Sequence, residues 1–203
     1  GFNYRNGCDV CPLRGNKAPK VEPYGSDSPT VYMLGDKPSF EDVKGGRPFS
    51  GAAGDMLRRH LPKWVDARDL RWNNCLKSRP PKGRDPAPSE LASCRSYIED
   101  DILATRPKAI FGFGVTPLSW MGIADSGINA WAGRYVPVRI KDHVCWYFPM
   151  MDPGYVLQTN GAAYKPGRDS GGVVAGSDCC ASRHQPKGPC SAYEVVSYRP
   201  RGS

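Results

Sequence analysis

The sequence has no apolar run as long as a membrane-spanning helix needs, which is about 20 residues. Its first residues, GFNYRNGCDVCPL, also lack the apolar core of a secretory signal peptide. We therefore expect an intracellular, cytoplasmic protein with no membrane contact. The chain does not begin with methionine, which leaves open whether it is a fragment of a longer protein. No internal repeat is visible, which argues against a repeat architecture.

The composition is that of one domain with many turns. The chain has 203 residues, among them 23 glycines and 20 prolines. We expect a single domain over 1–203, with a loop-rich segment at 1–29 and a divergent Gly/Ser/Cys-rich tail at 160–203. The net charge of +8 suggests a polyanionic partner. Solubility alone is the alternative explanation of that charge.

Eight cysteines are unusual in a chain that lacks a secretory signal, where metal binding outranks disulfides. Cys8 and Cys11 form a CxxC pair, while Cys75 and Cys94 flank a proline-rich basic loop. Four thiolates from two distant segments could hold zinc or a [4Fe–4S] cluster. The alternative is a set of small buried apolar side chains.

Short apolar runs that alternate with helical patterns predict an α/β protein with a mostly parallel sheet. The predicted strands are 30–35, 71–77, 108–114, 134–140 and 144–151, and the predicted helices are 55–64, a long one from Ser89 with a good N-cap, and one from 116 to 121. Functional residues of such sheets gather at the carboxyl ends of the strands. Gly35-Asp36, Asn74, Gly112–Gly114 and Asp152 all stand at such ends.

Three ordered blocks of the sequence resemble the family 4 uracil-DNA glycosylases. They are VYMLGDKPSFEDVKGGRPFSGAAGDML, NCLKSRPPKGRDPAPSELASCRSYIEDDILATRPKAIFGFG and FPMMDPGYVLQ. The resemblance covers residues 8 to about 158. It implies a three-layer α/β/α fold with a central four-stranded parallel sheet. It also implies a monofunctional DNA N-glycosylase of base excision repair with a [4Fe–4S] cluster, and we expect a monomer that binds duplex or single-stranded DNA with a flipped base.

The resemblance assigns the cluster ligands one by one. Cys8 and Cys11 match the first two cysteines of the family motif, and Cys94 matches the fourth. The third position falls on Ser78, so Cys75, three residues earlier, is the expected substitute. Further candidates in reserve are Cys145, Cys179, Cys180 and Cys190.

The resemblance also assigns residues to the base and the phosphates. Phe49 matches the aromatic residue that stacks on the extruded base. Asn74 matches the amide that reads the base edge, and Asn73 is the alternative if the strand register differs. Arg79, Lys82 and Arg84 lie in the basic loop and would meet phosphates. For any one of these three, a solvated loop charge is the alternative.

Two important positions depart from the family pattern. Asp36 occupies the place of a glutamate, and its neighbour Lys37 puts a cation at the pocket wall. Asp152 stands where the family has a histidine that stabilises negative charge on the departing base. An ionised aspartate would oppose a uracil anion there. Simple uracil excision by the family mechanism is therefore in doubt.

Three interpretations of Asp152 remain open. A protonated Asp152 could donate a hydrogen bond to uracil. The base could instead be a modified or cytosine-type pyrimidine, as in phage-related DNA modification or defence. Finally, the chain could bind DNA without catalysis. Of these interpretations, we prefer the modified pyrimidine. We take Asp36 and Asp152 as the catalytic candidates, and Lys37 as a further residue that binds the nucleobase.

The three histidines do not stand in the catalytic position of the family pattern. They are His60, His143 and His184. We expect His143 to be a loop residue. His184 could join Cys179, Cys180 and Cys190 in a second metal site, although their spacing fits no standard zinc pattern.

Overall fold

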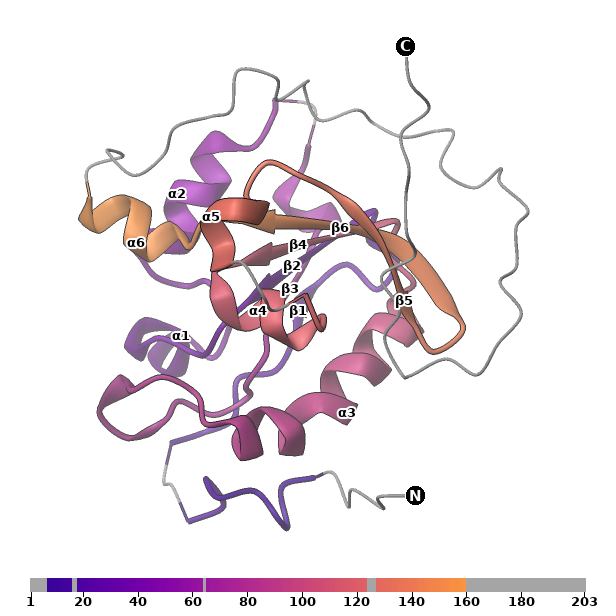
Figure 1. Ribbon diagram of the computed structural model, residues 1–203. Helices are drawn as coiled ribbons and strands as arrows, with labels where there is room; N and C mark the ends of the chain where they lie inside the picture. Colours follow the sequence, from indigo (N-terminus) through magenta and orange to yellow (C-terminus); the bar gives the residue numbers. More distant parts are fainter. Residues whose placement is uncertain (1–6, 16–17, 64, 124–126, 160–203) are drawn as a thin grey trace.

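A six-stranded sheet forms the centre of the computed structural model, which describes residues 7–15, 18–63, 65–123 and 127–159. The strand order is β1-β3-β2-β4-β6-β5 (Figure 1). The bounds are Tyr24–Gly25 for β1, Val31–Gly35 for β2, Arg71–Asn74 for β3, Ala109–Phe113 for β4, Val136–Ile140 for β5 and His143–Met150 for β6. No helix in these ranges is long and apolar enough to span a bilayer.

The four central strands β3, β2, β4 and β6 run parallel, which confirms the predicted four-stranded parallel core. The edge strands β1 and β5 pair antiparallel with β3 and β6. The antiparallel β5–β6 hairpin closes through Lys141, whose φ of 51° is the left-handed conformation that a tight turn needs. The parallel strands all end on the same side, toward α1 and α6 in Figure 1.

Helices cover both faces of the sheet, which gives three layers. One face packs on α3 (Pro88–Thr105) and α4 (Val115–Trp120), with α5 (Gly127–Trp131) beside them. The other face carries α2 (Ala52–His60) and α6 (Pro153–Gln158). Two elements lie near the carboxyl ends of the strands: α1 (Phe40–Gly45) and the 3-10 turn η2 (Pro81–Gly83). The turn η1 (Ala67–Asp69) precedes β3.

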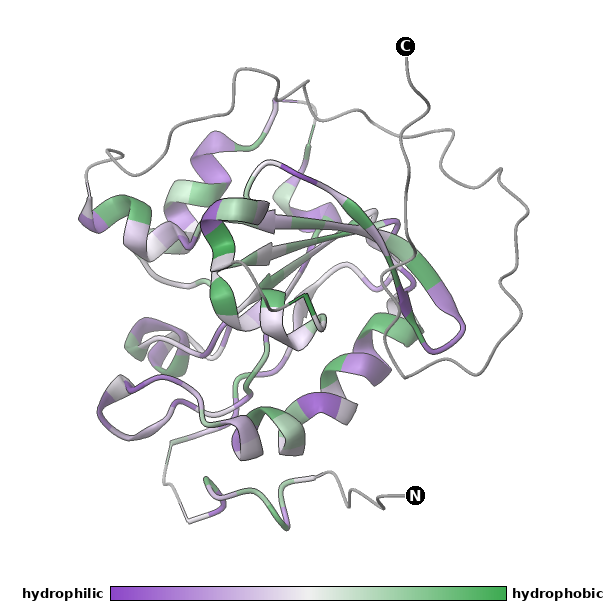
Figure 2. Cartoon of the chain, in the orientation of Figure 1, coloured by the Kyte–Doolittle hydropathy of each residue, from purple (hydrophilic) through white to green (hydrophobic). Residues whose placement is uncertain are grey.

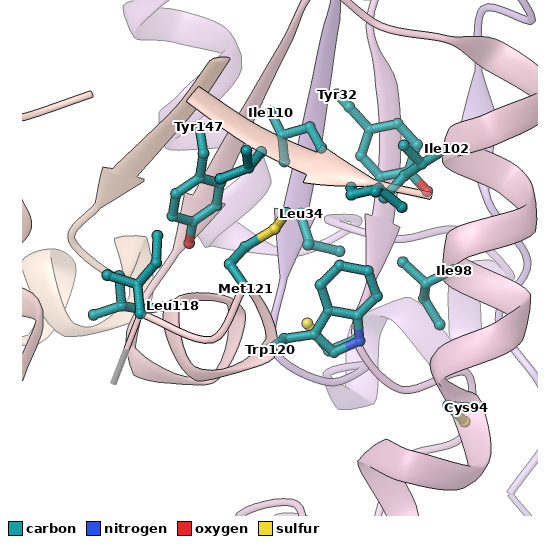
Figure 3. Packing of buried hydrophobic residues seen from close by; sticks show 14 of the residues in the cluster. Tyr32, Leu34, Cys94, Ile98, Ile102, Ile110, Leu118, Trp120, Met121 and Tyr147 are labelled. Atoms are coloured by element: carbon teal, nitrogen blue, oxygen red, sulfur yellow. The ribbon is translucent and has the colours of Figure 1, made fainter. Parts of the chain in front are cut away.

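The larger core lies between the sheet and α3. Ile98 and Ile102 of α3 point toward Tyr32 and Ile110 of the strands (Figure 3), and all four are fully buried. Each such side chain contributes about 1.5–3 kcal/mol through removal of apolar surface from water. In Figure 2 hydrophobic and hydrophilic residues alternate along α3, as expected for a helix with one face on a sheet.

The start of α3 differs from the predicted cap at Ser89. The N-cap is Ala87, and Pro88 is the first helical residue, a position where proline is favoured because its missing N–H would be unpaired anyway. Glu90 supplies the cap from within the helix, because its Oε2 accepts a hydrogen bond from the Ala87 N–H at 2.8 Å. The Glu90 carboxylate also pairs with Arg84, whose Nη1 lies 3.0 Å from Oε2. Hydrogen bonds from Arg84 lower the pKa of Glu90 below its usual 4.5.

Glu90→Gln is expected to lower the free energy of unfolding by about 1–2 kcal/mol at pH 7, since a charged hydrogen bond and part of the cap are lost. Because the folded-state pKa of Glu90 is lowered, this stabilisation is present above the unfolded pKa and is lost as the pH falls through the folded one. Urea unfolding at pH 7 and pH 3 should therefore show a difference from wild type that shrinks in acid.

Asp142→Asn is the matched control, since Asp142 pairs with Arg106 at the surface with 74% of its side chain exposed. We expect almost no change for this variant. Equal losses in the two variants at pH 7 would contradict the role given to Glu90.

Candidate active site

The ends of β2 and β3 bring three side-chain positions into contact. Gly35 and Asn74 are partners in the parallel register of the two strands. A Cβ at position 35 would lie 2.3 Å from Asn74 Oδ1 and 2.8 Å from Phe49 Cζ. Asn74 and Phe49 therefore lie directly over the bare backbone of Gly35. The structure thus places two of the residues expected to bind a base side by side.

Two polar atoms at this edge of the sheet have no protein partner. Asp36 Oδ1 and Asn74 Nδ2 are both buried and unpaired within the described residues. One is an acceptor and the other a donor. Buried polar groups are nearly always hydrogen-bonded, so an unpaired acceptor and an unpaired donor on adjacent strand ends favour a site that a ligand or water completes.

Asn73 has different surroundings from Asn74. Its side chain is buried on the α3 side, where Nδ2 donates to the Tyr32 hydroxyl at 2.8 Å. Its Oδ1 accepts the backbone N–H of Asn74 at 2.8 Å. The antiparallel partner β1 pairs only with Arg71 and Trp72. Beyond the end of β1, the Asn73 side-chain oxygen accepts the backbone N–H of Asn74 in place of a strand partner. The Tyr32 hydroxyl in turn donates to Asp101 at 2.6 Å.

Phe49 is held in a strained conformation by its surroundings. Its φ of 56° is unfavourable for a bulky residue. Arg58 Nη1 donates to the Phe49 carbonyl at 2.8 Å, and Gly54 approaches that carbonyl so closely that a Cβ would lie 1.8 Å from its oxygen. The ring meets Trp72 and Phe113 edge-on, with centroids 5.3 and 5.8 Å away.

Asp42 connects α1 to the same loop. Its Oδ1 accepts the Ser50 N–H at 2.7 Å, while its Oδ2 accepts the Ser39 N–H at 3.1 Å in a capping box. Arg58 and Asp42 did not enter the sequence prediction. Only Asp42 had a readable signal, the spacing of Ser39 and an acid three residues later, which is typical of a helix start.

Lys37 lies between two carboxylates. Its Nζ is 2.8 Å from Asp36 Oδ2 and 3.0 Å from Asp85 Oδ1. Burial by itself would lower the pKa of Lys37, but the hydrogen bonds and charges of the two aspartates outweigh burial and raise the pKa. A protonated ammonium has no lone pair, so this arrangement disfavours Lys37 as a Schiff-base nucleophile at neutral pH.

Asp152 is the N-cap of α6 as well as a residue of this edge. Its Oδ1 accepts the Tyr155 N–H at 2.8 Å, and Pro153 is the first helical residue. Its Cβ would be 3.4 Å from a Cβ at Gly114, the residue that follows β4. Asp152 is therefore both turn residue and neighbour of the strand ends. In the hydrogen bond with the Tyr155 N–H, the Asp152 carboxyl oxygen is the acceptor.

Two of the predicted ligand cysteines, Cys8 and Cys11, act electrostatically on a third, Cys94. The charges of Cys11 and Cys8 influence Cys94, although burial is the largest cause that raises the pKa of the Cys94 thiol. For Cys8, burial is outweighed by Lys20 and Tyr97, whose hydrogen bonds lower the pKa of the thiol. The Leu13 N–H points at Cys11 Sγ at 3.4 Å. Of these thiols, Cys8 has the donors and the cation that favour a thiolate.

Cys75 lies in a different environment. It is completely buried in the main core, and burial followed by the charge of Asp36 raises the pKa of its thiol well above the usual value. Cys94 is its only cysteine neighbour among these influences. Within the described ranges no three His, Cys, Asp or Glu side chains are grouped so as to hold a metal ion. The described residues therefore do not show the cluster site that the resemblance implies, and the whole ligand set stays a prediction.

The three basic residues of the loop have different surroundings: Arg84 is paired, Arg79 is half-buried and Lys82 is exposed. Arg84 is paired with Glu90, so its first role is to fix the loop on α3. The Arg79 guanidinium packs on Gly83, where a Cβ would lie 2.5 Å away. Lys82 is exposed and has a φ of 56°. Phosphate contacts of the three residues stay a prediction.

The remaining candidates have structural surroundings. His143 is the first residue of β6 and not a loop residue as expected; it is buried and its Nε2 lies 2.8 Å from the Pro107 carbonyl oxygen. His60 Nδ1 bonds the Met56 carbonyl on the surface of α2. Burial raises the pKa of Cys145 to about 12, as for a core residue. The tail residues Cys179, Cys180, His184 and Cys190 lie outside the described residues.

Comparison with known proteins finds relatives that share about a third of their matched residues. The type-4 uracil-DNA glycosylase of Thermotoga maritima is 34% identical over 114 residues, which are 56% of this chain and 59% of the relative. That of Archaeoglobus fulgidus is 33% identical over 108 residues, 53% of this chain and 54% of the relative. The chain thus spans little more than half the length of these two. For that of Saccharolobus solfataricus the identity is 26% over 156 residues, 74% of this chain and 72% of the relative.

Gly35→Ala is expected to push Asn74 and Phe49 aside, because the added Cβ would overlap both side chains. We expect a loss of about 1–3 kcal/mol in the free energy of unfolding and a shifted Asn74 side-chain amide signal in a nitrogen–proton NMR spectrum. Gly15→Ala is the control, since nothing lies within 4 Å of a Cβ there. An unchanged Asn74 signal in Gly35→Ala would contradict the packing described above.

The profile of the uracil DNA glycosylase superfamily matches residues 22–168 of the chain. This span makes up well over half of the sequence and includes Asp36, Phe49, Asn74 and Asp152. The described α/β/α layers and the parallel strand core agree with the fold that the resemblance implied. The chain therefore belongs to the uracil-DNA glycosylase superfamily.

Proposed function

We propose that this protein is a DNA glycosylase that flips a pyrimidine base out of DNA and hydrolyses its N-glycosidic bond with a water nucleophile. The observation that carries the proposal is the pair of buried unpaired atoms at the ends of β2 and β3, Asp36 Oδ1 and Asn74 Nδ2, with Asn74 beside Phe49. The relatives support it, because each is named a type-4 uracil-DNA glycosylase.

Each pocket residue has a chemical role in this proposal. The Phe49 ring replaces part of the stacking that a flipped base loses. Asn74 Nδ2 donates to an acceptor on the base edge, and its Oδ1 accepts from a ring N–H. Lys37 bonds Asp36 Oδ2, which leaves Oδ1 to orient the attacking water and to oppose the positive charge that develops on the sugar.

Asp152 determines which base is removed, in our proposal. The departing base gains negative charge, which an ionised carboxylate next to it would destabilise. Asp152 Oδ1 accepts from the Tyr155 N–H, so this oxygen is an acceptor at the start of α6. An acceptor at this place suits a base that carries an amino or hydroxyl group. We therefore propose a cytosine-type or otherwise modified pyrimidine, as would occur in phage-related DNA modification or defence.

Two other functions compete with this one. Ordinary uracil excision for base repair is favoured by the names of the relatives. A DNA-binding module without catalysis would have Asp36 and Asp152 as structural residues, and the N-cap contact of Asp152 is what such a module would show.

Release of free base from defined DNA tests the proposal. Duplexes with uracil, cytosine, 5-hydroxymethyl or glucosylated pyrimidines would be scored for alkali-labile abasic sites. We expect faster release of a modified pyrimidine than of uracil. Asp36→Asn should slow release at least about 100-fold, since it removes the group that positions water. Asp152→His should shift the preference toward uracil.

Asp142→Asn, an exposed acid on the β5–β6 turn, is the control and should excise at the wild-type rate. Uracil as the best substrate of the wild type would overturn the assignment of Asp152. Release from no substrate would leave the DNA-binding module as the function.

We further propose that Cys8, Cys11 and Cys94, with Cys75 as the fourth ligand, bind a [4Fe–4S] cluster. The electrostatic contacts of Cys94 with the other cysteines support this set. A coordinated thiol is deprotonated by the metal, so the raised pKa of Cys75 does not prevent ligation. When bound, the cluster would connect the N-terminal segment, the end of β3 and α3. In this proposal the cluster takes no part in breaking the N-glycosidic bond, which is the role of Asp36 and Asp152.

Iron content and absorbance near 400 nm test the ligand set without reference to activity. We expect Cys8→Ser and Cys75→Ser to lose both signals. Ser78→Ala should keep them. If Cys75→Ser kept its colour while Ser78→Ala lost it, the fourth ligand would be Ser78. Colourless wild type purified without oxygen would refute the cluster.

A further inference from the structure

A surface groove of about 350 Å³ lies between α1 and the basic loop. Its lining combines apolar and basic side chains: Ala18, Phe40, Val43, Arg79, Pro80, Pro81 and Lys82. Phe40, Val43 and the two prolines form an apolar wall.

Phe40 is the unusual member of this lining. It is the first residue of α1 and 65% exposed, the highest exposure among the large apolar side chains of the described residues. The capping box between Ser39 and Asp42 fixes the backbone on which it stands. An exposed and anchored aromatic ring is suited to stacking on a flat partner.

The charges of the groove suit a polyanion. Lys82 is exposed at the tip of the loop, and its ammonium has no partner among the described residues. The Arg79 side chain lines the same groove. Aromatic rings beside lysine and arginine are the combination with which proteins bind single-stranded nucleic acid, because the ring stacks on a base and the cations meet phosphates.

The groove also lies next to the candidate active site. Phe40 follows Asp36 and Lys37 by only a few residues. The Lys37 ammonium, which bonds Asp36, reaches Asp85 of the basic loop at 3.0 Å. The same loop forms the groove wall through Pro80 to Lys82. A strand with one base in the pocket would therefore bring a neighbouring nucleotide to this groove.

We propose that the groove binds a second, unpaired nucleobase of the DNA strand, stacked on Phe40 with its phosphate beside Lys82. This inference rests on the proposed function, since it takes DNA as the ligand. It adds a contact to a base that is not excised. The groove would thus favour DNA whose stacking is already disturbed next to the target base, such as single strands or bubbles.

A binding assay without catalysis tests the groove. The probe is a single-stranded oligonucleotide with an abasic analogue that cannot be cleaved, flanked by the fluorescent base 2-aminopurine. Stacking on Phe40 should quench the fluorescence when wild-type protein binds. Phe40→Ala should bind at least about fivefold more weakly and lose the quench, whereas Phe40→Trp should keep both. Lys82→Gln should reduce the salt dependence by about one phosphate contact.

Tyr135→Ala is the matched control, because Tyr135 is another aromatic residue with 53% exposure, at the β5 side of the sheet. It should bind like wild type. Equal affinity and equal quench in Phe40→Ala and wild type would contradict base binding in the groove, even if the protein excises a base. Quenched binding that depends on Phe40, without excision of any base, would support the groove and refute the glycosylase. No DNA binding by wild type would refute both.

Discussion

The arrangement of Asn74 and Phe49 depends on a steric constraint, the absence of a side chain at Gly35. Asn74 and Phe49 occupy the space that a Cβ at this position would need. The parallel register places Asn74 opposite Gly35, so the two strand ends and the Phe49 loop meet at one point. Contacts from Arg58, Asp42 and Gly54 keep the loop around Phe49 in its strained backbone conformation.

The electrostatics of the site follow from two positions that depart from the family pattern: Asp36 with its neighbour Lys37, and Asp152. Lys37 holds one oxygen of Asp36 and leaves the other buried and unpaired, which is a costly state unless a ligand or water completes it. Asp152 caps α6 and faces Gly114 at the same edge of the sheet. A histidine at that position could donate to a departing base, whereas a capping carboxylate accepts. This change from donor to acceptor alters which nucleobases would be favoured at position 152 in the proposed reaction, and it leaves the fold unchanged.

The sequence predicted much of the fold because the signals were local. The strand at 31–35 is a buried run that stops at a glycine, and the long helix after Pro88 has clear spacing of apolar residues. Local signals failed where a partner from elsewhere decides. Ser89 looked like a cap, yet Glu90 and Arg84 define the start of α3. His143 looked like a loop residue, yet pairing with β5 and the Pro107 carbonyl place it in a strand.

The sequence by itself determined the family, the parallel core and the identities of Asp36, Phe49, Asn74 and Asp152, because these depend on residue type and order. Tertiary structure gave Asn73 and Asn74 different surroundings, since the Asn73 side chain bonds Tyr32 and the Asn74 N–H, whereas the Asn74 side chain lies over Gly35. It also buried Cys75 and Cys94 in the main core, with Cys11 of the N-terminal segment packed against that core. Such choices depend on contacts between distant segments, which no local pattern records.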